Sequence, residues 1–556
     1  MGMEKRVATL IPPNARIVAE FIGEDSNSAD TTVTKTKYLQ INPNCNYTVI
    51  DNFETKIEKA DIILLRSSAY ANLPASKVTK IINKISEYLK DDGMMIVILE
   101  NLAYADNISA ILRGEPPTVK SLLTFGELRN AISKSKMTIT KTLHSARETV
   151  VQRAIAEISK ASLNVTNYIV CAMKKEAAAN IKTTLIQSYL GEVLVCAGIR
   201  VNTPNQFMAA SPGVYVMSNK SGETVTLSPR EKYNNKIFIN QRVSSDSTQK
   251  GIEFFDSIVK HNYLMIEEMD DNPVLWQKKY EAIQFINFIA VHGVQTSTKA
   301  LADFFKQFNP NVRIFENQLS ELPPARDFAA EIARNEPVTI FFGALNRDKD
   351  FYDLLPAVNR IAAEYGDNVA FKVIARTKLF DSIESKNKTY IGRKEVYDGQ
   401  YVPYEIYEQA LRTTHIALLP LRDNIFNRSK SDLKFIECAG NGSVALASPT
   451  VYSNTIKDGE TGFIYQDVDD FYNKLKLLIN NHNKRREMAE KAYDYVKHNR
   501  LLSQHYEERW DWYNELLARL PELNAETYKR IELLKTKGLS AFGGFADSDT
   551  ALDFKF

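Results

Sequence analysis

The chain has 556 residues, of which 44% are hydrophobic, 25% charged and 10% aromatic, and this composition excludes a largely disordered protein. Lysine plus arginine (70) nearly balance aspartate plus glutamate (68), and a net charge of +2 argues against a general nucleic-acid binder, which carries a strong basic excess. A chain of this length exceeds a single hydrophobic core and predicts three or four domains.

The cysteines indicate neither a disulfide framework nor a zinc site. They have no paired CxxC spacing, which predicts buried thiols in a reducing compartment: Cys45, Cys171, Cys196 and Cys438. No set of histidine, cysteine and aspartate residues has the spacing of metal ligands, so we expect no bound metal. The N-terminus does not resemble a signal peptide, and no apolar run is as long as a membrane span. We therefore expect a cytoplasmic protein without a transmembrane segment.

The first segment, residues 1–178, alternates apolar strands with amphipathic helices. Strands are predicted at Ile17–Ile22, Ala60–Leu65, Met94–Leu99 and Tyr168–Met173. Helices are predicted at Ala75–Leu89 and Phe125–Ser135. This alternation predicts a parallel, doubly wound sheet.

Two further α/β segments follow, at residues 185–336 and 337–500. In the first of them we predict strands at VLVC, KIFIN, YLMIEE and FIAVHGV, and a helix over Lys299–Gln307 that is capped by Thr298. In the second, strands are predicted at VTIFFG, FKVIA, IALLPL and VALAS. A terminal helix (501–523) is expected to pack back on the body, and a polar helix with a flexible tail (524–556) to end the chain. Two such units predict facing Rossmann-like domains, with a ligand beyond the carboxyl ends of their strands.

The stretch LLPLRDNIFNRSKSDLKFIECAGNGS is the most informative part of the sequence. It predicts a buried strand, a polar loop and a helix that begins near Ser431. Ser431 and Asp432 lie where the helix N-terminus offers free N–H groups, and Lys430 and Lys434 add positive charge, so a diphosphate fits there. Glu437, one turn after Lys434, can accept hydrogen bonds from both hydroxyls of a ribose. The alternative is a solvated helix face with an i,i+3 ion pair.

This stretch resembles the donor-binding motif of retaining glycosyltransferases of GT-B fold, in the fourth family, which includes many bacterial polysaccharide and protein glycosyltransferases. The resemblance spans most of Glu192–Leu520 and is closest to the lysine- and serine-rich version, NRSKSDLKFIE. The family pattern has two glutamates separated by seven residues. Glu437 matches the second, which holds the ribose in the family, whereas the first falls on Ser429, so that carboxylate is missing.

A second match to the family is FFGALNRDKDFYDLL. Here a strand ends in Gly343, and Lys349 follows at the family's spacing for the lysine that contacts the donor phosphates. The arginine that usually follows the glycine is Ala344 here, and Arg347 is a candidate to replace it. The resemblance thus implies catalytic roles for Glu437, Lys434 and Lys349. It implies a donor-binding set of Gly343, Arg347, Lys349, Ser429, Lys430, Ser431, Asp432, Lys434 and Glu437.

Residues 185–336 resemble a reduced acceptor-side domain of the same family. The pieces are RVNTPNQFMAASPGV, the acidic cluster EEMDD and VQTSTKALADFF. An acidic cluster at a strand end that faces the cleft orients an acceptor hydroxyl or contacts the donor sugar; the alternative is an exposed strand end. The acceptor-side candidates are Arg200, Asp270 and Asp271.

The first segment resembles a methyltransferase fold that has lost its cofactor loop. The family expects a GxGxG turn after the first strand, and this chain has EFIGEDSNS with the single Gly23. Glu24 and Asp25 would face the carboxylate of the cofactor, an unfavourable contact. The acidic residue expected after the second strand is absent from KYLQINPN. We therefore expect a pseudo-methyltransferase scaffold that does not bind S-adenosylmethionine.

Together these features predict an α/β protein with two facing Rossmann-like domains (GT-B) and an N-terminal, doubly wound methyltransferase-like domain. The resemblance implies transfer of a sugar, with retention and without a metal, from a UDP- or GDP-sugar to a macromolecular acceptor such as a surface polysaccharide, a lipid-linked sugar or a protein such as flagellin. No covalently bound cofactor and no nucleic-acid partner are expected, and a homo-oligomer is left open. Two alternatives remain: an inactive scaffold, motivated by Ser429 and Ala344, and a bifunctional glycosyl- and methyltransferase.

Overall fold

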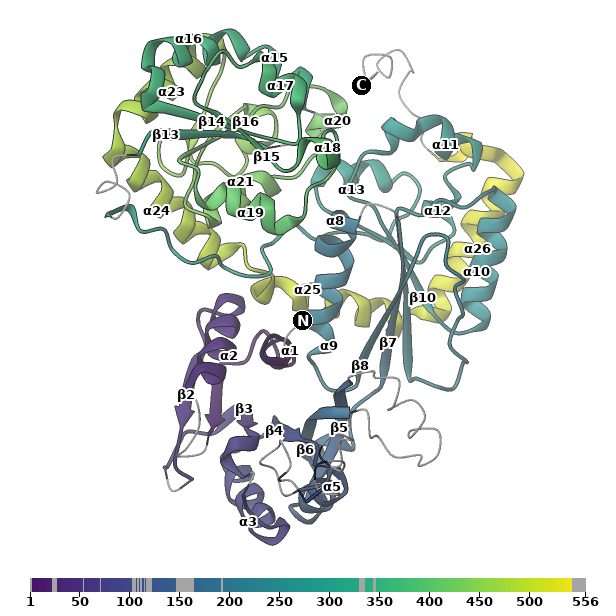
Figure 1. Ribbon diagram of the computed structural model, residues 1–556. Helices are drawn as coiled ribbons and strands as arrows, with labels where there is room; N and C mark the ends of the chain where they lie inside the picture. Colours follow the sequence, from purple (N-terminus) through teal and green to yellow (C-terminus); the bar gives the residue numbers. More distant parts are fainter. Residues whose placement is uncertain are drawn as a thin grey trace. The chain divides into compact units, whose positions relative to one another are not determined.

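The computed structural model of the protein describes residues 3–22, 28–53, 55–70, 72–102, 107, 110, 113–114, 116, 123–146, 165–191, 194–329, 336–343 and 347–542. Its chain forms two compact units (Figure 1). The first unit consists of Met1–Leu185, Asn205–Val216 and Tyr233–Asn235. The second unit consists of Ile186–Pro204, Met217–Lys232 and Lys236–Phe556.

The first unit is built on a six-stranded sheet of order β2-β1-β3-β4-β6-β5. The strands are β1 (Ile17–Phe21), β2 (Asn46–Ile50), β3 (Ala60–Leu65), β4 (Leu89–Glu100), β5 (Met137–Ala146) and β6 (Val165–Lys174). The pairs among β1 to β4 are parallel, but β6 is antiparallel to both β4 and β5. The four predicted strand positions are confirmed, whereas the prediction of a wholly parallel sheet is wrong, because β5 and β6 pair as antiparallel neighbours at one edge.

Both faces of this sheet are buried, as expected for a doubly wound fold. Along β3, Ile63 and Leu65 pack into one hydrophobic core, and Ile62 and Leu64 into another, because successive side chains of a strand point to opposite faces. The helices of this unit are α1 (Met3–Ala8), α2 (Ser28–Ile41), α3 (Ala75–Ser86), α5 (Phe125–Lys134) and α7 (Lys175–Ala178). A capping box formed by Thr124 and Glu127 begins α5.

The segment after the first strand departs from the prediction in one respect. Residues Lys37–Ile41 of KYLQINPN belong to helix α2, so this stretch is not the second strand. The second strand is β2, and the exposed Asp51 follows it directly, so the prediction that no acidic residue follows the second strand is wrong. Gly23, Glu24 and Asp25 lie outside the described residues.

A second six-stranded sheet has the order β12-β11-β10-β9-β7-β8. Its strands are β7 (Thr184–Leu190), β8 (Val214–Lys220), β9 (Asn235–Gln241), β10 (Leu264–Glu268), β11 (Gly293–Thr296) and β12 (Val312–Ile314). We call the part of the second unit that is built on this sheet the first lobe. Its described helices are α8 (Leu194–Ala197), the π-helical turn Gly198–Asn202, α10 (Thr248–Lys260), α11 (Gln277–Ala282), α12 (Ile286–Ile289) and α13 (Lys299–Phe305). Helix α9 (Thr203–Ala209) belongs mostly to the first unit.

Two strand predictions in this lobe are wrong. VLVC was predicted as a strand, but Leu194–Ala197 is helix α8, and the strand of this region is the preceding β7. FIAVHGV was predicted as one strand, but it begins in helix α12, and β11 starts only at Gly293. A short apolar run is compatible with a buried helix as well as a buried strand. The cap is confirmed, because the Thr298 side chain accepts a hydrogen bond from the Leu301 N–H.

The third sheet has the order β15-β14-β13-β16-β17-β18, and all its pairs are parallel. Its strands are β13 (Val338–Phe342), β14 (Val369–Ile374), β15 (Lys388–Ile391), β16 (Ile416–Leu419), β17 (Val444–Ala447) and β18 (Phe463–Ile464). We call the part built on this sheet the second lobe. The helices around it are α15 (Asp348–Tyr352), α16 (Leu355–Tyr365), α17 (Thr377–Ser382), α18 (Lys394–Tyr397), α19 (Tyr404–Arg412), α20 (Ile425–Arg428), α21 (Leu433–Gly440), α22 (Pro449–Tyr452) and α23 (Val468–Asn480).

The sheet of the second lobe reverses its strand order beside β13, which has β14 on one side and β16 on the other. Doubly wound sheets bind ligands at such a switch point, outside the carboxyl ends of the strands. Gly343 follows β13 there, and Pro420 follows β16. The expected α/β fold with two facing Rossmann-like domains is confirmed by the two lobes.

Three long helices end the described chain: α24 (His482–Asn499), α25 (Leu502–Ala518) and α26 (Leu520–Lys537). The predicted boundary at 523/524 falls inside α26, which is amphipathic rather than simply polar. It buries Leu523, Ile531 and Leu534 and lies beside α10, where Tyr528 hydrogen-bonds to Asp256 (Figure 1). The tail from residue 543 onward lies outside the described residues. Within the described part of the chain, no helix is both long enough and apolar enough to cross a membrane.

Candidate active site

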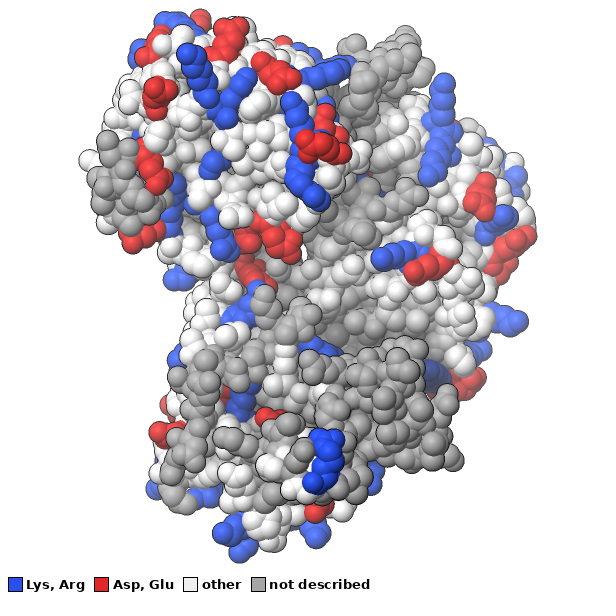
Figure 2. Space-filling view, in the orientation of Figure 1, with Lys and Arg blue, Asp and Glu red and all other residues white. Residues whose placement is uncertain are grey.

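A cavity of about 280 Å³ opens in the second unit at the switch point of the third sheet. Residues of both lobes line it, and several are charged, including Arg242 and Asp271 from the first lobe and Lys430, Lys434 and Glu437 from the second. The cavity thus brings charges of both signs together in a partly enclosed place. On the face of the molecule that Figure 2 shows, lysine and arginine side chains are likewise interspersed with aspartate and glutamate.

The floor of the cavity in the second lobe begins where β13 ends. Gly343 is required there, because a Cβ on it would lie 2.0 Å from the ring of Phe341. Arg347 begins α15 and lines the cavity; its guanidinium contacts Asn427 Oδ1 and lies 3.3 Å from Asp350. Ala344 lies outside the described residues. Arg347 is therefore the arginine that this loop brings to the cavity within the described residues.

Helix α21 carries Glu437 into the cavity wall with its carboxylate held on one side. Lys434 Nζ lies 2.9 Å and the Tyr407 hydroxyl 3.0 Å from the same oxygen, Glu437 Oε2. The ammonium of Lys434 also lies over the Tyr407 ring, 4.1 Å from its centre. Burial, together with the neighbouring Glu437 carboxylate, raises the pKa of Tyr407, so its hydroxyl stays a donor. Glu437 Oε1 accepts no hydrogen bond from a described residue, which leaves it for a ligand.

The opposite wall, in the first lobe, is an ion-pair network around Arg242. This residue follows β9 in a left-handed backbone conformation (φ +58°), which costs a non-glycine residue about 1–3 kcal/mol. Its Nε lies 2.6 Å from Asp270 and its Nη2 2.5 Å from Asp271. Lys430 Nζ reaches across from the second lobe to Asp271. Burial alone would raise the pKa of Asp271, but Lys430 and Arg242 hold it below its usual range.

The acidic cluster EEMDD divides into two pairs. Glu267 and Glu268 are fully buried at the end of β10, whereas Asp270 and Asp271 line the cavity. Burial raises the pKa of Glu267 well above its usual value, and Asn240 donates to it at 2.7 Å. Glu268 forms an ion pair at 2.8 Å with Arg200.

Arg200 also lines the cavity, but its donors are already engaged. Besides Glu268, it donates to the Phe315 carbonyl at 2.6 Å and to Asn317 Oδ1 at 2.8 Å. Only 2% of the residue is exposed. This arrangement holds the chain that leaves the first lobe, so the contacts of Arg200 are those of a structural anchor.

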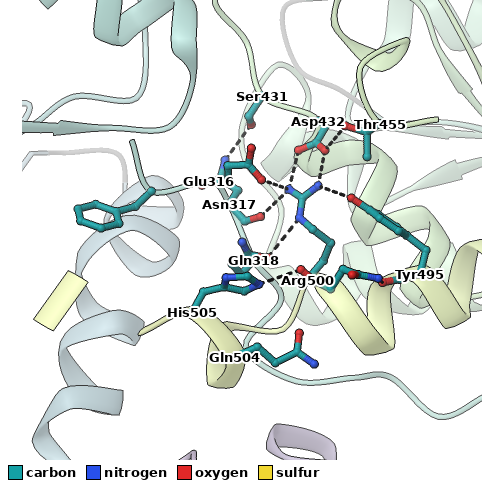
Figure 3. Close-up of polar contacts among 12 residues, drawn as sticks. Glu316, Asn317, Gln318, Ser431, Asp432, Thr455, Tyr495, Arg500, Gln504 and His505 are labelled. Atoms are coloured by element: carbon teal, nitrogen blue, oxygen red, sulfur yellow. Dashed lines mark hydrogen bonds and ion pairs between the residues drawn. The ribbon is translucent and has the colours of Figure 1, made fainter. Parts of the chain in front are cut away.

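Three predicted donor-binding residues do not line the cavity. Lys349 is exposed on α15. Ser429 is 3% exposed, and its hydroxyl accepts from Asn272 Nδ2 at 2.9 Å and donates to the Ile425 carbonyl at 3.0 Å. Asp432, the N-cap of α21, pairs with Arg500 (Figure 3). The predicted residues that the structure brings to the cavity are Gly343, Arg347, Lys430, Ser431, Lys434, Glu437, Arg200, Asp270 and Asp271.

Three residues that bear on the site were missed in the sequence. Arg242 follows a buried strand directly, which is a signal that could have been used. Tyr407 lies on a separate helix, 30 residues before Glu437, and Arg500 lies 68 residues after Asp432, so neither has a local signal. Among the described residues, no group of three histidine, cysteine, aspartate or glutamate side chains is placed to hold a metal ion.

The second lobe matches a known family. The model of the family described as "Glycosyl transferase-like" matches residues 367–515, about a quarter of the chain. This part, which contains α21 and Glu437, is therefore similar to glycosyltransferases. No curated protein matches the sequence.

Several solved structures are similar to part of the chain at low identity. One is a mutant of TarM from S. aureus in complex with fondaparinux, alpha-GlcNAc-glycerol and UDP, at 15% identity and a TM-score of 0.37; the match covers 51% of this chain and about half (55%) of TarM. Sucrose-phosphate synthase from Thermosynechococcus elongatus has 14% identity and a TM-score of 0.42, covering 60% of this chain and 99% of that one. HepE from Anabaena, in complex with UDP and glucose, has 10% identity and a TM-score of 0.42, covering 60% of this chain and 100% of that one.

Proposed function

We propose that the protein is a glycosyltransferase that takes its sugar from a nucleoside diphosphate donor, a UDP- or GDP-sugar. The observation that carries the proposal is the Glu437 carboxylate on the cavity wall. Lys434 and Tyr407 hold one of its oxygens, and the other is left for a ligand. A fixed carboxylate is a strong acceptor for the hydroxyls of a ribose. The match of residues 367–515 to a glycosyltransferase-like family supports the same chemistry.

The positive groups of the cavity suit the diphosphate. Lys430, Lys434 and Arg347 line the same cavity and lie near the switch point, where phosphates bind in doubly wound folds. In sugar transfer the nucleoside diphosphate is the leaving group, and these cations would offset the charge that develops on it. The chemistry then needs no metal for this purpose, and we propose a metal-independent reaction with retention at the anomeric carbon.

The acceptor would approach from the first lobe. Asp270 and Asp271 line the cavity opposite Glu437 and are oriented by Arg242. One oxygen of Asp270, Oδ2, accepts no hydrogen bond from a described residue, so it is available to an incoming hydroxyl. We propose a macromolecular acceptor, a surface polysaccharide or a protein, and a cytoplasmic location for the enzyme.

For the N-terminal unit we propose a pseudo-methyltransferase scaffold. Its sheet reverses order beside β1, and there a buried ion pair joins the carboxyl ends of β1 and β3: Arg66 Nε lies 2.5 Å from Glu20 Oε1. Thr34 and Tyr47 complete this cluster, at 2.6 Å from Arg66 and 2.7 Å from Glu20. Glu20 and Arg66 are buried, at 0% and 6% exposure, so a cofactor at this switch point would have to displace the cluster.

The test is to incubate the full chain with UDP-glucose, UDP-N-acetylglucosamine and GDP-mannose and to measure release of the nucleoside diphosphate, with and without bacterial surface glycan as acceptor. We expect release from one nucleotide series, and at least tenfold slower release from a Glu437→Ala variant at donor concentrations below saturation. Calorimetric titration of UDP and GDP accompanies the assay. Tight nucleotide binding without turnover of any donor would favour the inactive scaffold, and no binding of either nucleotide would refute the proposal.

A further inference from the structure

Arg500 is a buried cation at the point where the chain returns from the second lobe to the first. It stands between α24 and α25, and only 3% of it is exposed. Burial alone would lower its pKa, but the Asp432 carboxylate raises the pKa above the ordinary value, so the guanidinium remains charged. A buried charge is costly unless it is paired and hydrogen-bonded. The partners of Arg500 therefore show what its position is for.

The guanidinium of Arg500 joins the N-terminal end of α21, the donor-side helix, to the chain that links the lobes (Figure 3). Nη2 lies 2.8 Å from Asp432 Oδ1, and Nη1 contacts the other oxygen of the same carboxylate. Nη2 also donates to the Asn317 carbonyl at 2.8 Å, and Nε to Gln318 Oε1 at 3.2 Å. A fork-to-fork pair of this kind fixes direction as well as distance.

The two passages of the chain between the lobes are bonded to each other at this residue. The Leu319 N–H donates to the Arg500 carbonyl at 2.9 Å, and the Leu502 N–H donates to the Leu319 carbonyl at 2.8 Å. Residues 317–319 lie on the outward passage, and residues 500–502 on the return. Arg500 thus stands where the outward and return passages are bonded together.

The same cluster reaches the cavity through one further step. Asn317, whose carbonyl binds Arg500, donates from its side chain to Ser431 Oγ at 2.8 Å, and Ser431 lines the cavity. Asp432 is also held by Thr455 at 2.7 Å and is the N-cap of α21. Both residues that precede the helix are therefore held by this cluster, Ser431 through Asn317, which also lines the cavity, and Asp432 through Arg500 and Thr455.

We propose that Arg500 is a positioning residue for donor binding, which sets the N-terminal end of α21 against the two passages between the lobes. The inference rests on the proposed function, because it takes the cavity to be the donor site. Asp432 is then the anchor of the donor-side helix instead of a ligand of the donor. A displacement of about 1 Å in such a site is enough to cost about a hundredfold in rate.

The experiment compares the full chain with Arg500→Lys, Arg500→Gln, Asp432→Asn and the double variant Arg500→Gln/Asp432→Asn, which removes both charges together. Arg485→Gln is the matched control. Arg485, on α24, is buried like Arg500, but it donates to the Leu478 and Ile479 carbonyls, away from the cavity. The UDP and GDP dissociation constants are measured by calorimetry, the melting temperature by calorimetric scanning, and amide hydrogen exchange by mass spectrometry without ligand.

We expect each Arg500 or Asp432 variant to weaken binding of the preferred nucleotide at least tenfold. The fold-loss of affinity in the double variant should not exceed the product of the fold-losses in its two single variants. Peptides over residues 430–437 should exchange their amide hydrogens faster in each of these variants. Arg485→Gln should lower the melting temperature without these changes. Equal nucleotide affinity in Arg500→Lys, Asp432→Asn and the control would overturn the inference. If the unchanged chain binds no nucleotide, the proposed function fails. In that case, faster hydrogen exchange at residues 430–437 in Arg500→Lys would still support the positioning role of Arg500. Unchanged exchange there would overturn the positioning role as well.

Discussion

Replacing Glu437 with alanine tests the donor site most directly. The carboxylate presents one oxygen, Oε1, to the cavity, and a hydrogen bond to a charged acceptor is worth about 1.5–3 kcal/mol. Since 1.4 kcal/mol is a factor of ten in affinity, loss of one such bond should weaken UDP or GDP binding by about 10- to 150-fold. The free nucleoside should suffer as much as the diphosphate, because the ribose is common to both.

The same change has a separate cost in stability, which must be told apart from the loss of binding. Tyr407 is buried and donates to Glu437 Oε2, so alanine leaves its hydroxyl without this acceptor, at about 1–3 kcal/mol. Glu437→Gln keeps an acceptor oxygen of the same shape and should be more stable than the alanine variant, while still binding the nucleotide more weakly than the unchanged chain. Glu408→Gln on the neighbouring helix α19, where Glu408 pairs with Arg412, is the control and should change neither quantity.

The assay is calorimetric titration with the nucleotide and its nucleoside, at a temperature where urea unfolding shows the variants to be folded. A nucleotide affinity within twofold of the unchanged chain in both Glu437 variants would refute the assignment of the ribose to this carboxylate. A loss that is confined to the diphosphate would refute it too, because it would place Glu437 beside the phosphates.

Three further predictions follow from named contacts. Lys434→Met should weaken binding of the diphosphate at least tenfold and of the nucleoside much less, as checked by the same titrations; equal losses would make the lysine structural. Burial lowers the pKa of His292 to about 4, and its Nδ1 accepts from the Met265 N–H, so the folded protein holds the neutral ring. The ordinary pKa of histidine is about 6.5, so the neutral ring contributes its full stability at neutral pH, and this contribution is lost as the pH falls toward 4. The free energy of unfolding should fall by about 2 kcal/mol between pH 7 and pH 5 for this reason. Urea unfolding at both pH values should show this drop, and His292→Gln should remove this part of it. S-adenosylmethionine should give no calorimetric signal with the full chain, because Glu20 and Arg66 bond each other at the switch point; a micromolar dissociation constant would restore the bifunctional alternative.

The second lobe was the part of the fold that the sequence predicted best. Its inner strands are continuous apolar runs flanked by turns, and VALAS and VTIFFG each contain the observed strand. The first lobe was harder, because VLVC is too short for its period to separate helix from strand, and it became α8. In the first unit, the position of β6 was predicted but its antiparallel direction was not, because the direction of a strand in its sheet is a tertiary property.

The candidate site shows the same division between local and distant information. Lys434 and Glu437 are three residues apart on a helix, so their contact could be predicted from spacing alone. Arg500 and Asp432 meet only because two passages of the chain cross between the lobes, and no local pattern encodes that meeting. For this reason the spacing assigned Asp432 to a ligand, whereas the structure gives it a buried partner.

The serine at 429 was the strongest sequence feature against activity, and its surroundings change its weight. Ser429 does not line the cavity: it is buried against Asn272 of the first lobe, and Thr298 donates to its carbonyl at 3.0 Å. Position 429 carries no glutamate, but Glu437 still shares the cavity with two other carboxylates, because Asp270 and Asp271 stand on the facing wall. Lys430, the next residue, binds one of these aspartates from the donor side. The segment therefore has contacts that join the two lobes where the family pattern has a carboxylate, and acidic groups face the cavity from the other side. Arg242 orients both aspartates, so carboxylates stand on two facing walls of the cavity, one wall for the donor and one for the acceptor of the proposed transfer.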